Sequence, residues 1–368
     1  MKRISSAVLL ALFACGTPPA PSAGESALPV DTLAVAMSIG EELGDSTCTF
    51  GLIQDAIILE DGRMLVLDRQ SACIKVFDTE GGYLTQVSRR GGGPGELNMP
   101  WEFFQMPGGN VMVLEMMKQG FVVFDDSLRL EREISHWTQN PPMQSVPLSD
   151  STFASYKIDA DMVDEVILMN RRIVIYTVGE EDFDTVLWED SLTATPGDLM
   201  ENPSMFITDL LDAFCLEGDG AGSVYFSEKS GEEYRIIGWN ASGEEFFRAS
   251  LDLEPVPKTP EEIAEEKAYV TQYIQNMGGG MPFEFEPEPF RNMVVALGVG
   301  PDGNLWVQRG TSDTPYFDIF DASGNPVSHA AFPEQGWSWT FSISPRGILA
   351  WEADPADGFQ RLYVLNQE

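Results

Sequence analysis

One unit of apolar runs and turn-forming residues recurs six times along the chain. In each copy, a turn that contains Gly or Asp leads directly into a short run of Val, Ile, Leu, Met, Phe, Tyr or Trp. These turn-and-strand segments cover residues 60–67, 107–114, 149–156, 219–226, 301–307 and 345–351. Gly and Asp tolerate the left-handed backbone that such tight turns need. The pattern predicts one strand after each turn.

A second apolar run follows each of these strands. Clear copies lie at residues 74–78, 121–125, 173–176 and 317–321, and weaker copies lie at 234–239 and 362–365. Repeated four-stranded units hide their sheet edges when they are arranged around an axis. The chain is therefore predicted to be all-β, a six-bladed β-propeller with four-stranded blades.

The two ends of the repeat array complement each other. The last unit stops directly after its third strand, while the apolar segment 31–39 precedes the first complete unit without a partner. Because unpaired strand edges are unfavourable, we expect strand 31–39 to complete the last blade. Residues 30–368 then form a single propeller domain.

A Gly-rich segment lies between the first and second units. It reads Arg89-Arg90-Gly91-Gly92-Gly93-Pro94-Gly95-Glu96-Leu97, and Pro100 follows it. With the preceding strand, this segment resembles the bacterial six-bladed propeller family related to NHL repeats, in which such a link joins the first two blades. The resemblance is good over the first two units, fair over the fifth and weak over the third and fourth. It implies the fold and an exported, lipoprotein-type location, because many members are exported or lipid-anchored without an assigned activity.

The start of the chain has the features of an export signal. Two basic residues precede an apolar run that ends at residue 14 and is too short to span a membrane. Leu12-Phe13-Ala14-Cys15 resembles a bacterial lipobox, so residues 1–14 are predicted to be removed and Cys15 to carry the lipid. Residues 15–29 then form a flexible tether. We expect a periplasmic or cell-surface protein that touches the membrane, inner or outer, through lipid alone; an ordinary cleaved signal is the alternative.

Export also bears on the other cysteines. An oxidising compartment favours disulfides, and Cys48 and Cys73 fall in one unit, whereas Cys215 lies in an apolar run. Spacing alone leaves their pairing open.

The links between units are long, and the longest covers residues 254–291. It contains a predicted helix at about 259–277, with Thr259 as N-cap, Pro260 in the first turn and Glu262 completing a capping box. All inter-blade links of a propeller lie on one face, which predicts that this face binds a partner. The helix is either a lid hinged at Gly278–Gly280 or a rigid surface decoration.

The charge balance excludes several classes of partner. The chain has 58 acidic and 22 basic residues, a formal net charge of −36, and so repels nucleic acids and anionic lipid surfaces. Its two histidines, His136 and His329, exclude a three-histidine zinc site. The acidity fits either adaptation to salt or an acidic binding surface.

Scarce basic residues recur just after the second strand of five units. They are Arg69, Lys118, Lys157, Lys229 and Arg309, with Arg291 close to the fifth unit. We predict a basic ring that attracts a carboxylate or sulfate group on an anionic small molecule or glycan. The alternative is that each residue pairs with a local carboxylate and fixes a loop. Trp337 and Trp339 are candidates for stacking on a sugar ring of the ligand. The alternative is that they pack between blades.

Acidic and amide residues near the inner strands suggest a different chemistry. Asp55, Glu102, Asp209 and Asn292 could supply oxygen ligands to calcium, as in metal-dependent hydrolases of the lactonase type, although structural pairing or exposure is the better explanation of single acidic residues in so acidic a chain. The sequence lacks nucleophile-elbow and zinc-protease motifs. We therefore predict a non-catalytic binding or scaffold module for a protein, anionic or glycan partner, and a metal-dependent hydrolase as the alternative.

Overall fold

The computed structural model describes residues 28–42, 44, 46–135, 137, 141–163, 166–201, 213–276, 285–334, 339–353, 355 and 358–367. The predicted export signal, Cys15 and most of the tether lie outside these residues, as do Asp209, Trp337 and Gly278–Gly280.

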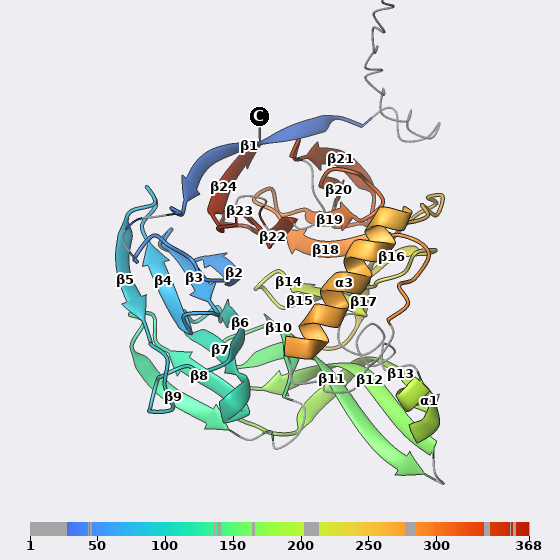
Figure 1. The fold of residues 1–368 in the computed structure, drawn as a ribbon, viewed down its shortest axis with the longest axis horizontal. Coiled ribbons are helices and arrows are strands. Elements are labelled where there is room, and N and C mark those ends of the chain that lie inside the picture. The colour runs from blue at the N-terminus through green and yellow to red at the C-terminus, as the bar shows by residue number, and fades with distance from the viewer. Residues whose placement is uncertain are drawn as a thin grey trace, which may run out of the picture.

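Six four-stranded blades surround a central axis, which confirms the predicted propeller (Figure 1). Blade 1 contains β2 (Ile53–Ile58), β3 (Met64–Asp68), β4 (Cys73–Phe77) and β5 (Tyr83–Val87), and blade 2 contains β6 (Pro100–Gln105), β7 (Val111–Glu115), β8 (Gly120–Phe124) and β9 (Leu130–Ser135). Blade 3 contains β10 (Met143–Pro147), β11 (Thr152–Val163), β12 (Val166–Thr177) and β13 (Phe183–Ala194), and blade 4 contains β14 (Phe214–Gly218), β15 (Ser223–Glu228), β16 (Tyr234–Asn240) and β17 (Glu245–Leu251). Blade 5 contains β18 (Val294–Val299), β19 (Leu305–Arg309), β20 (Tyr316–Phe320) and β21 (Pro326–Ala331), and blade 6 contains β22 (Trp339–Ser344), β23 (Gly347–Glu352) and β24 (Leu362–Gln367).

The N-terminal strand β1 (Val30–Ile39) closes the ring, as the sequence predicts. It pairs antiparallel with β24, from Leu33 opposite Gln367 to Ile39 opposite Leu362. Its first residues also pair in parallel with β21, with Val30 opposite His329. These two pairings join blades 5 and 6 into one eight-stranded sheet.

The middle strands carry the core. Every residue of β3, β4, β7 and β8 is buried, because each blade packs between two neighbours and both of its faces are covered. The outer strand β9, by contrast, has one buried residue, Ile134. This difference explains why the second and third strands appear in the sequence as continuous apolar runs.

Blade 3 differs from the prediction in length. Its strands β11 and β12 pair continuously from Thr152 opposite Thr177 to Val163 opposite Val166, and form a hairpin that projects beyond the ring (Figure 1). The sequence pattern predicts only residues 152–156 and 173–176 of these strands. No Gly or Pro lies between residues 157 and 178, and polar residues interrupt the apolar pattern of the projecting part.

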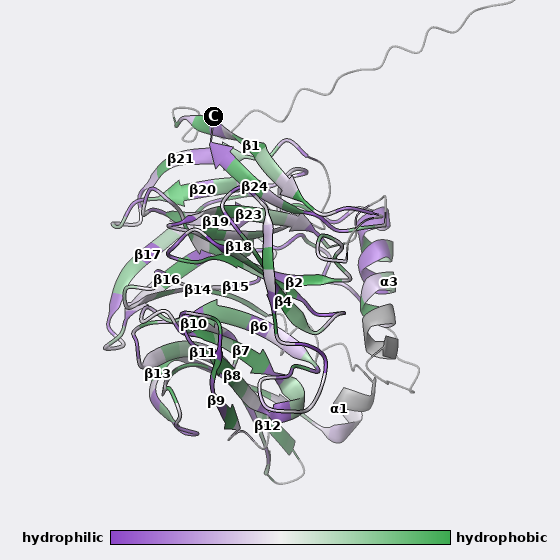
Figure 2. Cartoon of the chain, turned by 90° about the vertical axis from the view of Figure 1, so that its left-hand side faces the viewer, coloured by the Kyte–Doolittle hydropathy of each residue, from purple (hydrophilic) through white to green (hydrophobic). Residues whose placement is uncertain are grey.

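The predicted helix is present as α3 (Pro260–Asn276), and shorter helices lie at η1 (Met116–Lys118) and α1 (Pro196–Glu201). The N-terminus of α3 has the predicted capping box: Glu262 N donates to Thr259 Oγ1 (3.2 Å), and Thr259 N donates to Glu262 Oε2 (2.7 Å). Both α3 and α1 lie on the same face of the ring (Figure 2). Within the described part of α3, no side chain is fully buried.

Two further findings concern the cysteines and the membrane. Cys48, Cys73 and Cys215 are free thiols. Among the described residues, no helix is both long enough and apolar enough to cross a bilayer.

Candidate functional site

The inner strands of blades 1 and 2 are bulged close to the face that carries the links. The pairing register shifts between Ile53 and Asp55 in β2 and between Pro100 and Glu102 in β6. A bulge adds an unpaired residue, bends the strand and redirects side chains. The added residues are Gln54 and Trp101, which come from neighbouring blades.

Two buried carboxylates fix the segments that lead into these bulges. Asp68, at the end of β3, accepts hydrogen bonds from Gly51 N (3.0 Å) and Leu52 N (3.2 Å). Glu115, at the end of β7, accepts from Met99 N (3.0 Å) and Met117 N (2.9 Å). Both therefore bind backbone N–H groups, and neither forms an ion pair with the basic residue that follows it, Arg69 or Lys118, although Asp68 lies 3.8 Å from Lys75.

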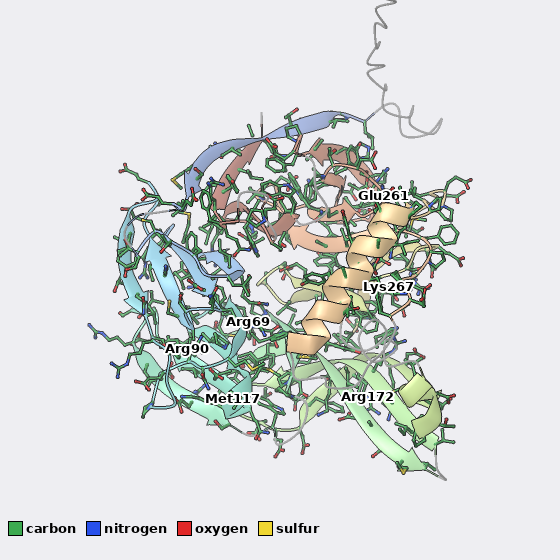
Figure 3. The ribbon with its side chains drawn as sticks, viewed as in Figure 1. Arg69, Arg90, Met117, Arg172, Glu261 and Lys267 are labelled. Carbon is green, nitrogen blue, oxygen red and sulfur yellow. The ribbon has the colours of Figure 1, made fainter. Side chains whose placement is uncertain are left out.

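Arg69 lies at the seam between blades 1 and 2 (Figure 3). Its guanidinium carbon is 4.6 Å from the centroid of the Trp101 ring, and its Nη1 donates to Gln54 Oε1 at 3.4 Å. Among the described residues, no carboxylate lies within 4.0 Å of this guanidinium. The two bulged residues thus hold a cation that no described carboxylate neutralises.

Most of the other predicted basic positions have carboxylate partners. Lys118 pairs with Glu133, and Lys157 lies 3.4 Å from Asp159. Arg291 contacts Glu262 (2.7 Å) and Asp313 (2.9 Å). Lys229 is partly exposed, and its backbone N–H donates to Ala213 O. For Lys118, Lys157 and Arg291 the structure thus shows pairing with carboxylates, which is the alternative to the predicted basic ring.

The remaining member, Arg309, belongs to a buried network in blade 5. Its Nε and Nη2 donate to the two oxygens of Asp318 at 2.6 and 2.7 Å. Tyr234 Oη donates to the same carboxylate (2.7 Å), and His329 Nδ1 lies 3.0 Å from it. Burial alone would raise the pKa of Asp318, but hydrogen bonds from His329, Arg309 and Tyr234 lower it. Asp318 therefore stays ionised as the internal partner of Arg309.

The carboxyl groups of Asp55 and Glu102 connect inner strands of successive blades. Asp55 Oδ2 accepts from Phe103 N (3.4 Å) in blade 2, while its Oδ1 accepts from Ala56 N (2.8 Å). Glu102 accepts from Gln144 N (2.7 Å) and Ser145 N (3.0 Å) in blade 3. Both residues are partly buried.

A third inner-strand carboxyl, Glu217 of β14, was missed by the sequence analysis. It accepts a hydrogen bond from its own neighbour, Gly218 N (3.1 Å). Burial raises the pKa of Asp55 to about 7, of Glu102 to about 7 and of Glu217 to about 8, and the charge of Asp55 contributes to the last two shifts. These groups can bind or release a proton near neutral pH. Because acidic residues are so frequent in this chain, no sequence signal singles out Glu217.

The described residues cover only part of the predicted metal site, because Asp209 lies outside them. Within that part, no group of three or more His, Cys, Asp or Glu side chains is arranged to hold a metal ion. Asn292 precedes β18 and is partly exposed. Trp339 packs against Phe332, with ring centroids 4.9 Å apart, and against Tyr363 at 5.4 Å, so it contributes to packing within and between blades 5 and 6.

Comparisons with known proteins agree on the fold. A family model described as a six-bladed β-propeller matches residues 45–175. A protein from Bacteroides fragilis NCTC 9343, named a "putative exported protein", has a similar structure with a TM-score of 0.53 and 13% identity, over 91% of this chain and 95% of that one. A member of the DUF4221 family from Bacteroides vulgatus ATCC 8482 has a TM-score of 0.51 and 9% identity, over 93% and 99% of the two chains. No curated protein matches the sequence. At these identities the likeness shows the propeller fold alone.

Proposed function

We propose that this protein is an exported, lipid-anchored binding module whose ligand binds near the centre of the ring, on the face that carries α3 and the long links. Two basic residues, an apolar run and Cys15 at the start of the chain support export and anchoring. The similar Bacteroides fragilis structure, which is named as an exported protein, supports the same location.

The observation that carries this proposal is the polar arrangement on the bulged inner strands. Gln54 and Trp101 hold Arg69, and the next residues in the chain, Asp55 and Glu102, are partly buried residues with carboxyl groups. Bulges interrupt strand pairing and are frequent beside functional sites, where they redirect side chains. A ligand at this position would contact a cation, an aromatic ring and hydrogen-bond acceptors.

A second candidate function is hydrolysis at the same centre. Asp55, Glu102 and Glu217 have pKa values raised by burial to about 7, 7 and 8, and a carboxyl group that holds its proton near neutral pH can act as a general acid. A lactonase-type metal would need ligands in addition to Asp55 and Glu102, and predicted Asp209 lies outside the described residues.

A thermal-shift screen of the full-length protein in mild detergent tests both candidates. Ligands that bind only the folded state raise the melting temperature, so we would compare sugar acids, dicarboxylates, sulfate, neutral sugars and calcium at fixed ionic strength. A rise that the Trp101→Ala variant loses, while circular dichroism shows it folded, supports binding at the centre. If no compound raises the melting temperature, the central site is rejected and a scaffold that binds through other surfaces is favoured. Turnover of lactone or ester substrates that Glu102→Gln abolishes would favour the hydrolase.

A further inference from the structure

We propose that Arg69, stacked on Trp101 at the seam between blades 1 and 2, binds the carboxylate of a hydroxylated organic acid such as a sugar acid. This inference rests on the proposed function, because it names the ligand group that the central site recognises.

Two donor nitrogens of the Arg69 guanidinium, Nε and Nη2, have no hydrogen-bond acceptor among the described residues. Nη1 faces Gln54 Oε1, and the guanidinium carbon lies over the Trp101 ring. Nε and Nη2 form the planar fork that matches both oxygens of a carboxylate, and the cation–π contact with the Trp101 ring restrains the guanidinium before the ligand arrives.

The same protein shows how such an arrangement is completed. Arg309, at the end of the second strand of blade 5, lies 5.1 Å from the Tyr316 ring centroid. Its Nε and Nη2 donate to both oxygens of Asp318. Blade 5 therefore supplies a carboxylate from within the fold to an arginine that lies over an aromatic ring.

A second stacked arginine has an internal partner as well. Arg171 lies 5.8 Å from the Trp188 ring centroid and donates through Nη2 to Asp190. Arg69 also lies over an aromatic ring, but it has no carboxylate partner among the described residues, although the chain has 58 acidic residues. We therefore expect a ligand to supply the carboxylate that accepts from Nε and Nη2 of Arg69.

Arg90 adds positive charge at the same seam. Its Nη2 donates to the backbone oxygen of Gln70 (2.6 Å), the residue after Arg69, and Figure 3 shows both arginines on this side of the ring. Arg90 is exposed, and no carboxylate among the described residues forms an ion pair with it. In a molecule with a net charge of −36, two such arginines make this seam a local attractor for an anion.

The neighbouring carboxyl groups restrict the class of acid. Asp55 and Glu102 directly follow Gln54 and Trp101 in the chain, both residues are only partly buried, and their carboxyl oxygens accept hydrogen bonds. A ligand that offers hydroxyl donors beside its carboxylate suits this pair, whereas a second anionic group would be repelled. A monocarboxylate with several hydroxyl groups, either free or at the end of an acidic oligosaccharide, fits these constraints.

Isothermal titration of the full-length protein in detergent tests the assignment with D-galacturonate, an oligogalacturonate and the neutral D-galactose. We expect both acids to bind and galactose to bind at least 10-fold more weakly, since hydrogen bonds to a charged group are stronger than those between neutral groups. If only the oligomer binds, the carboxylate that Arg69 recognises belongs to the end of an acidic polysaccharide and not to a free sugar acid.

Substitution of the arginine separates its role from general charge. Arg69→Gln is expected to weaken galacturonate binding at least 10-fold, and Arg69→Lys to restore only part of it, because lysine keeps the charge without the planar fork. Arg129→Gln is the matched control: it removes the same charge from an exposed turn between β8 and β9, at the opposite ends of the strands, and should change affinity less than 2-fold.

Three results would overturn the assignment: unchanged galacturonate affinity in Arg69→Gln, full recovery in Arg69→Lys, or no binding of either acid by the unsubstituted protein. The proposed function fails separately. If a neutral compound raises the melting temperature and the Trp101→Ala variant loses that rise, the proposed central binding site is supported. Only the assignment of Arg69 as the carboxylate-binding group is then rejected.

Discussion

Three carboxyl groups on inner strands titrate differently from those at the surface. Burial raises the pKa of Asp55, Glu102 and Glu217 to near or above neutrality. At the surface, the Gly93 N–H lowers the pKa of Glu96, and the Arg171 guanidinium lowers that of Asp190. A carboxyl with a raised pKa in the folded state binds more protons there than in the unfolded chain, so its contribution to stability falls as pH rises between the two pKa values.

Glu217→Gln should therefore stabilise the protein at alkaline pH and have little effect at acidic pH. The amide resembles the protonated acid, which the fold already prefers at pH 5, but it removes the charge that the fold must accommodate at pH 8.5. We expect the melting temperature to rise on the order of 2–5 °C at pH 8.5 and to change by less than about 1 °C at pH 5. Calorimetry at the two pH values and fixed salt measures the difference.

Glu96→Gln is the control for this experiment. Its carboxylate accepts hydrogen bonds from Gly93 N (2.9 Å) and Arg89 Nε (2.8 Å), and its pKa is lowered. Removal of this charge should give no stabilisation at pH 8.5. An equal response of both variants at both pH values would show that the raised pKa of Glu217 does not affect stability.

Individual contacts were only partly predictable from sequence. The position of Asp55 and Glu102 near the start of inner strands could be predicted because the repeat fixes where each strand begins. The partner of Lys118 could not, since Glu133 comes from the outer strand β9, while nearby Glu115 is used by backbone N–H groups. A choice among so many carboxylates depends on strand register, which one sequence does not determine.

At the scale of elements, β1 determines whether the ring is closed. The side chain of Leu33 in β1 is completely buried. Val35, two residues further along β1 and opposite Leu365 of β24, is 46% exposed. Leu33 packs with Trp306, Phe317 and Phe341 from blades 5 and 6. The strand thus contributes both backbone pairing and core contacts to the two blades that it joins.

Leu33→Ala should destabilise the protein by about 2–5 kcal/mol, the usual range for removing a buried leucine side chain. Val35→Ala, in the same strand, should change stability by less than about 0.5 kcal/mol because little apolar surface is lost. Urea unfolding followed by tryptophan fluorescence measures both. Similar losses in the two variants would mean that β1 stabilises through its backbone alone.

Elements with strong local signals were predicted well, and their extent was predicted less well. The helix α3 starts where Thr259 and Glu262 form their capping box, and closure by segment 31–39 followed from the missing outer strand of the last unit. The length of β11 and β12 was underestimated because their projecting part has neither turn residues nor a continuous apolar face. Such a hairpin is specified by pairing between strands, which local pattern does not reveal.

The whole molecule combines a closed ring with a large excess of negative charge. Many of its basic residues are used in local ion pairs, such as Arg172 with Asp159 and Glu189, and Arg235 with Glu228. With 58 acidic residues against 22 basic ones, the remaining carboxylates repel one another across the surface. Self-repulsion of this kind destabilises a compact state, and salt reduces it.

Stability should consequently rise with ionic strength. Between 0.02 M and 1 M NaCl the screening length falls to about 3 Å, which weakens repulsion among exposed carboxylates more than it weakens the buried Arg309–Asp318 pair. We expect the melting temperature to increase on the order of 5 °C or more across this range. Sodium sulfate at matched ionic strength is the control: an equal rise indicates screening, whereas a much larger rise indicates exclusion of sulfate from the surface. A melting temperature that falls with NaCl would show that attractive ion pairs outweigh self-repulsion, and adaptation to salt would then no longer explain the acidity.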